Sequence, residues 1–401
     1  KIERLSGTGI LRMNGIGRQV GGTVNFAQEN IASTDTDNVS GILGAWATVG
    51  TSDWAFKSSF SEAGVDTGVT TGADKLVRRF TAYNNSSAAN DWVLSSTSGN
   101  MNVIADNTQN NSLANTLRFD STDPDLVRRV TLSGANLLNA GGILITPGMA
   151  GSDAVIDGQG TIATGRQFNA NLINDLIIIQ NNTVSQAEIS AIVANASANR
   201  ADRVGTTADG SPSVTGITNT ADLYVNMLVS GPGIAPNTRI TAITANGVTL
   251  SSNAGSGAGL GTLTFSQDRL ATTIAGTTTV TVPDASGLFA GMVVSGPGVL
   301  ADTRIASISG TTLTLNTPAG TGAGSGTLSF LTPTGLDKSG EGDLILSGSS
   351  TYTGITSINA GTLTVHQLAV QGFAGNTNMI SNVPSIGRSV TVASTNWLTI
   401  G

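Results

Sequence analysis

A repeat with a fixed spacing constrains the fold of this chain more than any other sequence feature. Ser230-Gly231-Pro232-Gly233 recurs as Ser295-Gly296-Pro297-Gly298, 65 positions further along. The same shift carries Thr238-Arg239-Ile240 onto Thr303-Arg304-Ile305. Short segments of alternating polar and apolar residues follow each tetrapeptide, so the repeat predicts two tandem β-modules. Arrays of such units usually span distance or present surface rather than perform chemistry.

The repeated tetrapeptide itself predicts a tight turn in each module. Proline fixes φ, and the glycines on either side of it can adopt positive φ. We therefore expect Gly231, Pro232 and Gly233 to form a structural turn. Gly296, Pro297 and Gly298 are expected to do the same in the second copy. No helix pattern follows the glycine-rich stretches at 255–261 and 320–326, which argues against a phosphate-binding loop.

The composition favours an all-β chain. Only 11% of the 401 residues are charged and 4% are aromatic, whereas 51 are glycine, and a helical enzyme would carry more Glu, Lys, Leu and Arg. Apolar runs such as Leu176-Ile177-Ile178-Ile179 are too short for helices and predict strands. One helix is expected, because Ser185 and Glu188 form a capping box ahead of apolar residues at helical spacing.

Charge and cysteine content exclude several classes of protein. The net charge of −7 argues against nucleic-acid binding, which needs a basic surface. No apolar run of about 18 residues is present, so no membrane-spanning helix is expected. The absence of cysteine excludes disulfides, thiolate zinc sites and cysteine nucleophiles. The chain begins with neither Met nor a signal-peptide pattern, and it ends in mid-pattern at Trp397-Leu398-Thr399-Ile400-Gly401. We therefore expect a segment or processed form of a longer chain.

A second repeat has a spacing of 50 positions. Leu76-Val77-Arg78-Arg79-Phe80-Thr81 recurs as Leu126-Val127-Arg128-Arg129-Val130-Thr131. Two coils of roughly 25 residues would stack these segments on one face of a solenoid. The arginines are interpreted as surface residues whose aliphatic stems cover the sheet, with an anion-binding stripe as the alternative.

Residues 335–365 carry a resemblance to a known family. They read Gly-Leu-Asp-Lys-Ser-Gly-Glu-Gly-Asp-Leu-Ile-Leu-Ser-Gly, then Thr-Tyr-Thr-Gly at 351–354, then Ile-Asn-Ala-Gly-Thr-Leu-Thr-Val at 358–365. This stretch resembles the autotransporter-associated β-strand repeat, departing from it at Ile355, where the family often has a second glycine. Weaker echoes occur at 38–54, 112–119 and 141–144. The resemblance implies a right-handed parallel β-helix on long, exported, surface-associated chains.

The predicted architecture is therefore an all-β right-handed parallel β-helix, or solenoid, into which two small β-sandwich-like modules are inserted. We expect residues 1–205 to form the shaft, 206–270 the first module and 271–332 the second. Residues 333–401 are expected to continue the shaft.

The sequence offers little catalytic chemistry. His366 is the single histidine, and no nucleophile elbow accompanies it. Asp153, Asp157 and Asp175, with Arg166, could supply the two carboxylates and the cation of a polysaccharide-cleaving β-helix. However, the Asp-Asp pair and Gly-His-Gly expected by analogy with polygalacturonases are missing. We predict no enzyme and no catalytic residues, and interpret these aspartates as parts of solenoid turns.

Calcium is the one cofactor that the sequence makes conceivable. Asp35 and Asp37 stand close together, as do Asp120, Asp123 and Asp125, and carboxylate oxygens suit calcium in an extracellular setting. Neither group matches an EF-hand or a nonapeptide repeat, so solvated acidic turns are the main interpretation.

The scarce large aromatic residues predict packing rather than binding. Trp46, Trp54 and Trp92 are expected in the core or at an end cap, with a sugar-stacking platform as the alternative.

These observations predict an extracellular, cell-surface structural protein that forms a fibre, filament or layer. Its partners would be copies of itself, associated non-covalently through exposed ends or strand edges. The alternative is an adhesin whose modules bind glycans or neighbouring cells. A polysaccharide-active enzyme is the third hypothesis.

Overall fold

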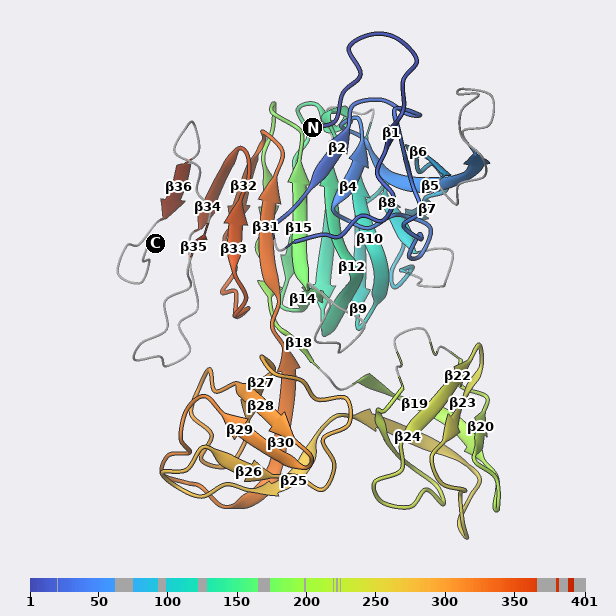
Figure 1. The fold of residues 1–401 in the computed structure, drawn as a ribbon, viewed down its shortest axis with the longest axis vertical. Helices are drawn as coiled ribbons and strands as arrows, with labels where there is room; N and C mark the ends of the chain where they lie inside the picture. The colour runs from blue at the N-terminus through green and yellow to red at the C-terminus, as the bar shows by residue number, and fades with distance from the viewer. Residues whose placement is uncertain are drawn as a thin grey trace.

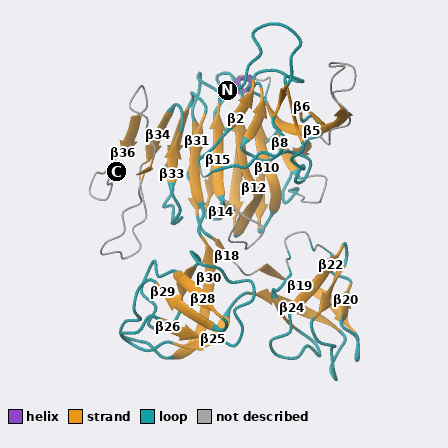
Figure 2. Ribbon diagram, viewed as in Figure 1, coloured by secondary structure: helices purple, strands orange, loops and turns teal. Residues whose placement is uncertain are grey.

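The structure is a computed structural model that describes all residues except 20, 62–74, 93–98, 122–127, 165–173, 198–199, 219, 221–222, 224, 366–379, 382–388 and 393–401. The described part is all-β (Figure 2), and its helical structure is one 3₁₀ turn, Pro147–Met149. None of it forms a helix long and apolar enough to cross a membrane.

Two parallel sheets contain most of the chain outside the repeated modules (Figure 1). The first parallel sheet contains β7 (Asn84–Ser86), β8 (Asn100–Val103), β10 (Leu113–Phe119), β12 (Ala135–Ile145), β14 (Thr161–Thr164), β15 (Asp175–Gln180), β17 (Ile192–Val193), β31 (Gly335–Ser339), β33 (Thr356–Ile358) and β35 (Ile380–Ser381). The second contains β9 (Asn107–Asn110), β11 (Arg128–Ser133), β13 (Ala154–Gly158), β16 (Ala187–Ile189), β32 (Asp343–Leu346), β34 (Thr362–Val365) and β36 (Ser389–Val392). The chain passes repeatedly from one sheet to the other, and one apolar core combines residues from both. This arrangement fits a β-helix.

The repeated modules do not interrupt these sheets. β31 lies parallel to β15, with Asp175 opposite Gly335, and β32 lies parallel to β16, with Ala187 opposite Leu344. Segments on either side of the modules are therefore direct neighbours in both sheets.

The helix predicted from the capping box is wrong. Ala187–Ile189 and Ile192–Val193 are the strands β16 and β17, which pair with β13 and β14. Ala187 and Ile189 point into the shared core while Glu188 points away from it, which is the period of a strand. Hydrogen bonds to the neighbouring strands outweigh the local capping signal, which tertiary pairing commonly does.

The N-terminal residues form a separate mixed sheet rather than further coils. Its order is β1 (Leu11–Arg12), β3 (Ala32–Thr34), β6 (Lys75–Arg79), β5 (Asp53–Ser61), β4 (Ala47–Val49) and β2 (Val24–Phe26). It packs on the outer face of the first parallel sheet, where Leu144, Ile177 and Ile179 meet Ile42 and Trp54. Leu176 and Ile178 point to the inner core instead. Both faces of β15 are thus buried, which accounts for its uninterrupted apolar sequence.

The predicted stacking of the 50-residue repeat is also wrong. β6 pairs antiparallel with β3 and β5 in the N-terminal sheet, whereas β11 lies in the second parallel sheet. Arg78-Arg79 and Arg128-Arg129 both lie in strands, whereas Leu126 and Val127 lie outside the described residues. The shared pattern therefore does not specify which strand lies next to it.

Each repeated module is a closed antiparallel barrel. The first contains β19 (Arg200–Thr207), β20 (Ser213–Thr215), β21 (Leu228–Ser230), β22 (Ile240–Thr244), β23 (Gly247–Leu250) and β24 (Leu260–Ser266). The second contains β25 (Arg269–Thr272), β26 (Thr279–Thr281), β27 (Val293–Ser295), β28 (Ile305–Ser309), β29 (Thr312–Leu315) and β30 (Ser325–Thr332), and β18 (Ala196–Ser197) pairs with β30. The bridges Leu228–Arg239 and Val293–Arg304 join the two ends of each strand order. The predicted sandwich is therefore a barrel closed by hydrogen bonds, with its own apolar core in each copy.

The two barrels correspond strand by strand, but not through a single shift. β22 and β23 pair in the same register as β28 and β29, 65 positions later. Arg203 faces Leu263 and Arg269 faces Leu328, so the first strands are related by a shift of 66. The connection before the repeated tetrapeptide causes the difference, because 282–292 is one residue shorter than 216–227.

Candidate functional site

The repeated Ser-Gly-Pro-Gly segments adopt tight turns at equivalent places in the barrels. The Ile234 amide donates to the Gly231 carbonyl at 3.1 Å, and the Val299 amide donates to the Gly296 carbonyl at 3.1 Å. Gly233 has a φ of 67°, and a Cβ there would lie 2.6 Å from the Gly255 carbonyl oxygen. Pro232 packs over Gly261, and Pro297 packs over Gly326 in the same way. These residues shape the barrels.

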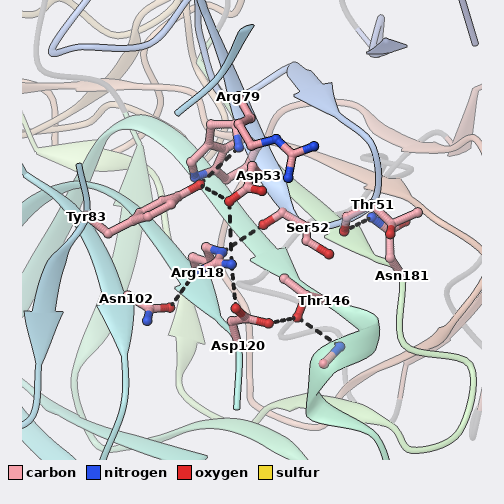
Figure 3. Close-up of polar contacts among 12 residues, drawn as sticks. Thr51, Ser52, Asp53, Arg79, Tyr83, Asn102, Arg118, Asp120, Thr146 and Asn181 are labelled. Atoms are coloured by element: carbon pink, nitrogen blue, oxygen red, sulfur yellow. Dashed lines mark hydrogen bonds and ion pairs between the residues drawn. The ribbon is translucent and has the colours of Figure 1, made fainter. Parts of the chain in front are cut away.

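A charged cluster around Arg118 joins the N-terminal sheet to the first parallel sheet (Figure 3). The Arg118 side chain, on β10, donates through Nε to the Ser52 carbonyl at 2.7 Å and lies 3.5 Å from the Asp53 carboxylate. Its guanidinium also stacks 4.6 Å from the centre of the Tyr83 ring. Burial raises the pKa of Asp53, and the charge of Arg118 opposes that rise. The cluster therefore couples two sheets through one half-buried arginine.

Tyr83 completes this connection as a neutral hydroxyl. Burial raises the pKa of Tyr83, so its proton is retained. The Trp54 amide donates to the Tyr83 oxygen at 3.1 Å, and that hydroxyl donates to Asp53 at 3.4 Å. These hydrogen bonds position Tyr83 between the β5 backbone and the Asp53 carboxylate, so the side chains serve to position strands.

Asp120, a predicted calcium ligand, belongs to the same cluster. Its carboxylate pairs with Arg118 and accepts a hydrogen bond from the Thr146 hydroxyl, which caps the 3₁₀ turn. Asp123 and Asp125 lie outside the described residues.

The second predicted calcium group carries a lysine. Lys57 Nζ lies 2.5 Å from the Asp37 carboxylate and 2.9 Å from the Asp35 carbonyl. The hydrogen bond from Lys57 and its charge hold the pKa of Asp37 below its ordinary value. Within the described residues, no three acidic or histidine side chains gather as a metal site would require. Calcium binding stays a prediction.

The carboxylates considered for polysaccharide cleavage are far apart in the fold. Asp157 lies on β13 in the second parallel sheet and pairs with Arg129. Asp175 begins β15 in the first parallel sheet, and Asp153 is exposed just before β13. Arg166 and His366 lie outside the described residues. The structure brings none of these aspartates together.

Sequence reasoning missed a second charged cluster, around Arg18. Arg18 lies 2.8 Å from the Asp175 carboxylate and 3.4 Å from the Asp337 carboxylate. Asn359 donates to Asp337 at 2.6 Å, and Ser339 donates to it at 3.3 Å. Burial raises the pKa of Asp337 to about 7; Arg18 opposes the rise and Asp175 adds to it. Arg18 and residues 21–23 thus cover the outer polar face of β31.

The next residue along β31 points the other way and is also fully buried. Lys338 donates to the carbonyls of Ser339 at 3.1 Å, Gly340 at 2.7 Å and Ala360 at 2.9 Å. Gly340 and Gly361 have positive φ, and a Cβ at Gly361 would lie 2.8 Å from Lys338 Nζ. The lysine and the glycines therefore form one unit that closes two successive turns, which gives a physical reason for a Lys-Ser-Gly and Ala-Gly-Thr pattern.

Residues 336–365 match the model of the passenger-associated-transport-repeat. The match runs from β31 to β34 and confirms the resemblance seen in the sequence. It indicates an autotransporter passenger domain, consistent with an exported surface protein. Comparison with curated proteins and comparison with solved structures each found no match.

The passenger-associated-transport-repeat also contacts the place where the chain enters and leaves the barrel insertion. Asn195, where the chain leaves the parallel sheets, accepts hydrogen bonds from the amides of Thr334 at 3.0 Å and Thr353 at 2.9 Å. Its amide group donates to the Thr353 hydroxyl at 3.0 Å. The Thr-Tyr-Thr-Gly segment of the repeat thus fixes the place where the insertion begins and ends.

Proposed function

We propose that this chain is part of the passenger of an exported, cell-surface structural protein. Residues from β7 onward would form a right-handed β-helical shaft, and the two barrels would project from it as an arm. The observation that carries this proposal is the unbroken pairing of β15 with β31 and of β16 with β32, which extends both parallel sheets into the matched repeat. Stacked coils contact only their neighbours, so such a shaft can lengthen without a larger core.

Copies of the protein would associate non-covalently into a fibre or layer. Trp92 covers the core beside β7 and donates to Ser86 at 3.2 Å, which disfavours strand addition at this end. The closed barrels also leave their strands paired on both sides. The outer faces of the barrels are therefore better suited to association than the strand edge at this end of the shaft.

Apolar side chains on those faces support this proposal. Leu260 is 74% exposed and Leu270 is 70% exposed, on the outer surfaces of the two barrels. Their neighbours across the strands are Thr206 and Thr327. A surface of threonine and leucine can be buried against another copy without leaving an unpaired charge.

Sedimentation velocity over a range of concentrations tests self-association. We expect larger species that persist at high salt and dissociate in urea. A Leu260→Ser, Leu270→Ser double variant should weaken association by more than about tenfold, because burial of each leucine contributes about 1.5–3 kcal/mol. Leu5→Ser is the control, since Leu5 is 90% exposed but lies in the N-terminal segment. A protein that stays monomeric at high concentration would refute the proposal.

We infer no catalytic role for the chain. Asp157 lies on β13 and Asp153 directly precedes that strand, whereas Asp175 begins β15 in the other parallel sheet. This placement supports the inference, because glycoside cleavage needs two facing carboxylates. Loss of an acidic polysaccharide on incubation with the purified protein, abolished by Asp157→Asn, would contradict it.

The projecting position of the barrels supports adhesion as a second candidate function (Figure 1). Binding to glycans or neighbouring cells should then be lost when the barrels are removed and be retained by the isolated barrel pair. Equal binding by the shaft alone would exclude it.

A further inference from the structure

One arginine occupies the same place in both barrels. The Arg239 amide donates to the Ser251 hydroxyl at 3.0 Å, and the Arg304 amide donates to the Asn316 side chain at 2.7 Å. These acceptors are related by the 65-residue shift. Each arginine also forms the bridge that closes its barrel.

The inner half of each guanidinium binds its own barrel. Arg239 Nη1 donates to the Asn226 carbonyl, and Arg304 Nη1 donates at 3.1 Å to the Gly291 carbonyl, again 65 positions later. A guanidinium carries five donors in a fixed fork, so a bond from Nη1 to its own barrel leaves further nitrogens that can bind a neighbouring unit.

The outer half of each guanidinium binds the next folded unit of the chain. Arg239 Nε pairs with the Asp284 carboxylate of the second barrel. Arg304 Nη2 donates at 2.9 Å to the Thr353 carbonyl, in the passenger-associated-transport-repeat. The acceptors and the donor nitrogens differ, but each arginine has the same position and the same contacts within its own barrel.

The joint between the first and second barrels is built around the ion pair between Arg239 and Asp284. The Asp284 backbone carbonyl accepts from Arg269 Nε at 2.7 Å, and its carboxylate accepts from the Ser286 amide at 2.7 Å. Burial alone would raise the pKa of Asp284, but the hydrogen bonds from Ser286 and the charge of Arg239 lower it. Gln267, in the linker, reaches back to the Asn226 carbonyl at 3.4 Å. The carboxylate is therefore ionised and aimed at the first barrel.

We propose that the surface around Arg239 and Arg304 is a repeated docking surface whose partner is the following folded unit of the same chain. It converts two tethered barrels into one stiff arm with a defined direction, running from the first barrel through the second to the shaft. This inference is independent of self-association.

Distances between spin labels in dilute samples test the two joints separately. The chain has no cysteine, so labels can be placed at Thr215→Cys and Thr281→Cys, which are exposed and equivalent in the two barrels, and at Val184→Cys on the shaft. The parent protein should give narrow distributions for both the 215–281 and the 281–184 pairs. Arg239→Ala should broaden the first at least about twofold in width, and Arg304→Ala should broaden the second.

Two further variants separate docking from folding. Asp284→Ala leaves the first barrel unchanged and should broaden the 215–281 distribution as Arg239→Ala does. Because that joint is an ion pair, about 1 M salt should also loosen it, whereas the Arg304–carbonyl joint should change less. Arg79→Ala, in the N-terminal sheet, is the control and should change neither distribution. Narrow distributions in every variant, or joint broadening of both pairs by Asp284→Ala, would overturn the proposal.

Discussion

Asp337 is a carboxyl group that is shielded from water and shares one cation with a second carboxylate. Arg18 contacts both Asp337 and Asp175, so the cluster holds two acids and one base. Protonation of one acid leaves a neutral pair, which is why burial and the charge of Asp175 raise the pKa of Asp337 to about 7.

This raised pKa predicts a pH-dependent stability. An unfolded aspartate has a pKa near 3.8, so between about pH 4 and 7 the folded state binds more protons than the unfolded state. The stabilisation is present at low pH and is lost as the pH rises through about 7. Asp337→Asn should imitate the protonated form and remove that slope, a difference of up to about 4 kcal/mol at neutral pH. Thermal unfolding at a series of pH values measures it.

The matched control is Asp343→Asn, because Asp343 is exposed at the start of the neighbouring strand β32. If Asp337→Asn keeps the pH slope of the parent protein, Asp337 is ionised in the folded state and the assignment fails.

Single residues differ in how well the sequence predicts their surroundings. The packing of the scarce aromatics is confirmed for Trp54 and Trp92, which are buried. The alternation along β31 predicts that Leu336 and Lys338 share one face of the strand and that Asp337 lies on the opposite face. The partner of Asp337 could not be predicted, because Arg18 lies 319 positions away and nothing local relates the two.

At the scale of elements, the repeated turn sets the shape of each barrel. Gly233 has a positive φ, and a Cβ there would overlap backbone atoms of Gly255 and Ala258 at 2.6 Å. Gly233→Ala should therefore destabilise the first barrel by more than about 1 kcal/mol, since both the strain and the overlap oppose the folded state. Urea unfolding measures this loss.

Gly255→Ala is the matched control, because the nearest atom to a Cβ at that glycine is 4.0 Å away. Equal unfolding midpoints for the two variants would show that the turn tolerates a side chain.

Elements were predictable where the signal was local. The glycine and proline turns, apolar strands such as β15 and the passenger-associated-transport-repeat all depend on residues close together in the sequence. Closure of the barrels does not, because it needs hydrogen bonds between the Met227 carbonyl and the Ile240 amide, and their counterparts, on strands with no distinguishing pattern. The strand β16 was missed for the same reason: its pairing with β13 and β32 decides its conformation.

At the scale of the whole molecule, the barrels are an insertion that begins and ends at one point. The side chain of Asn195 accepts a hydrogen bond from the Thr334 amide, so the two ends of the insertion are adjacent. β15 and β31, and likewise β16 and β32, pair without using any barrel residue. Each barrel in turn has an apolar core of its own. The shaft and the arm should therefore fold independently.

Excision of the insertion tests this independence. Removing residues 196–333 and joining Asn195 to Thr334 through two glycines should leave the parallel sheets intact. Excision breaks the Arg304–Thr353 hydrogen bond and removes the β18–β30 pair. We therefore expect an unfolding midpoint within about 5 °C of the parent shaft transition, since 1 kcal/mol shifts the midpoint of such a domain by about 2–4 °C. The isolated segment 200–332 should give its own cooperative transition.

Removing residues 335–346 instead takes one strand from each parallel sheet and should abolish folding of the shaft. If the excised shaft is unfolded while the barrels remain native, the barrels are needed to bring β31 against β15, and the insertion is an integral part of the shaft.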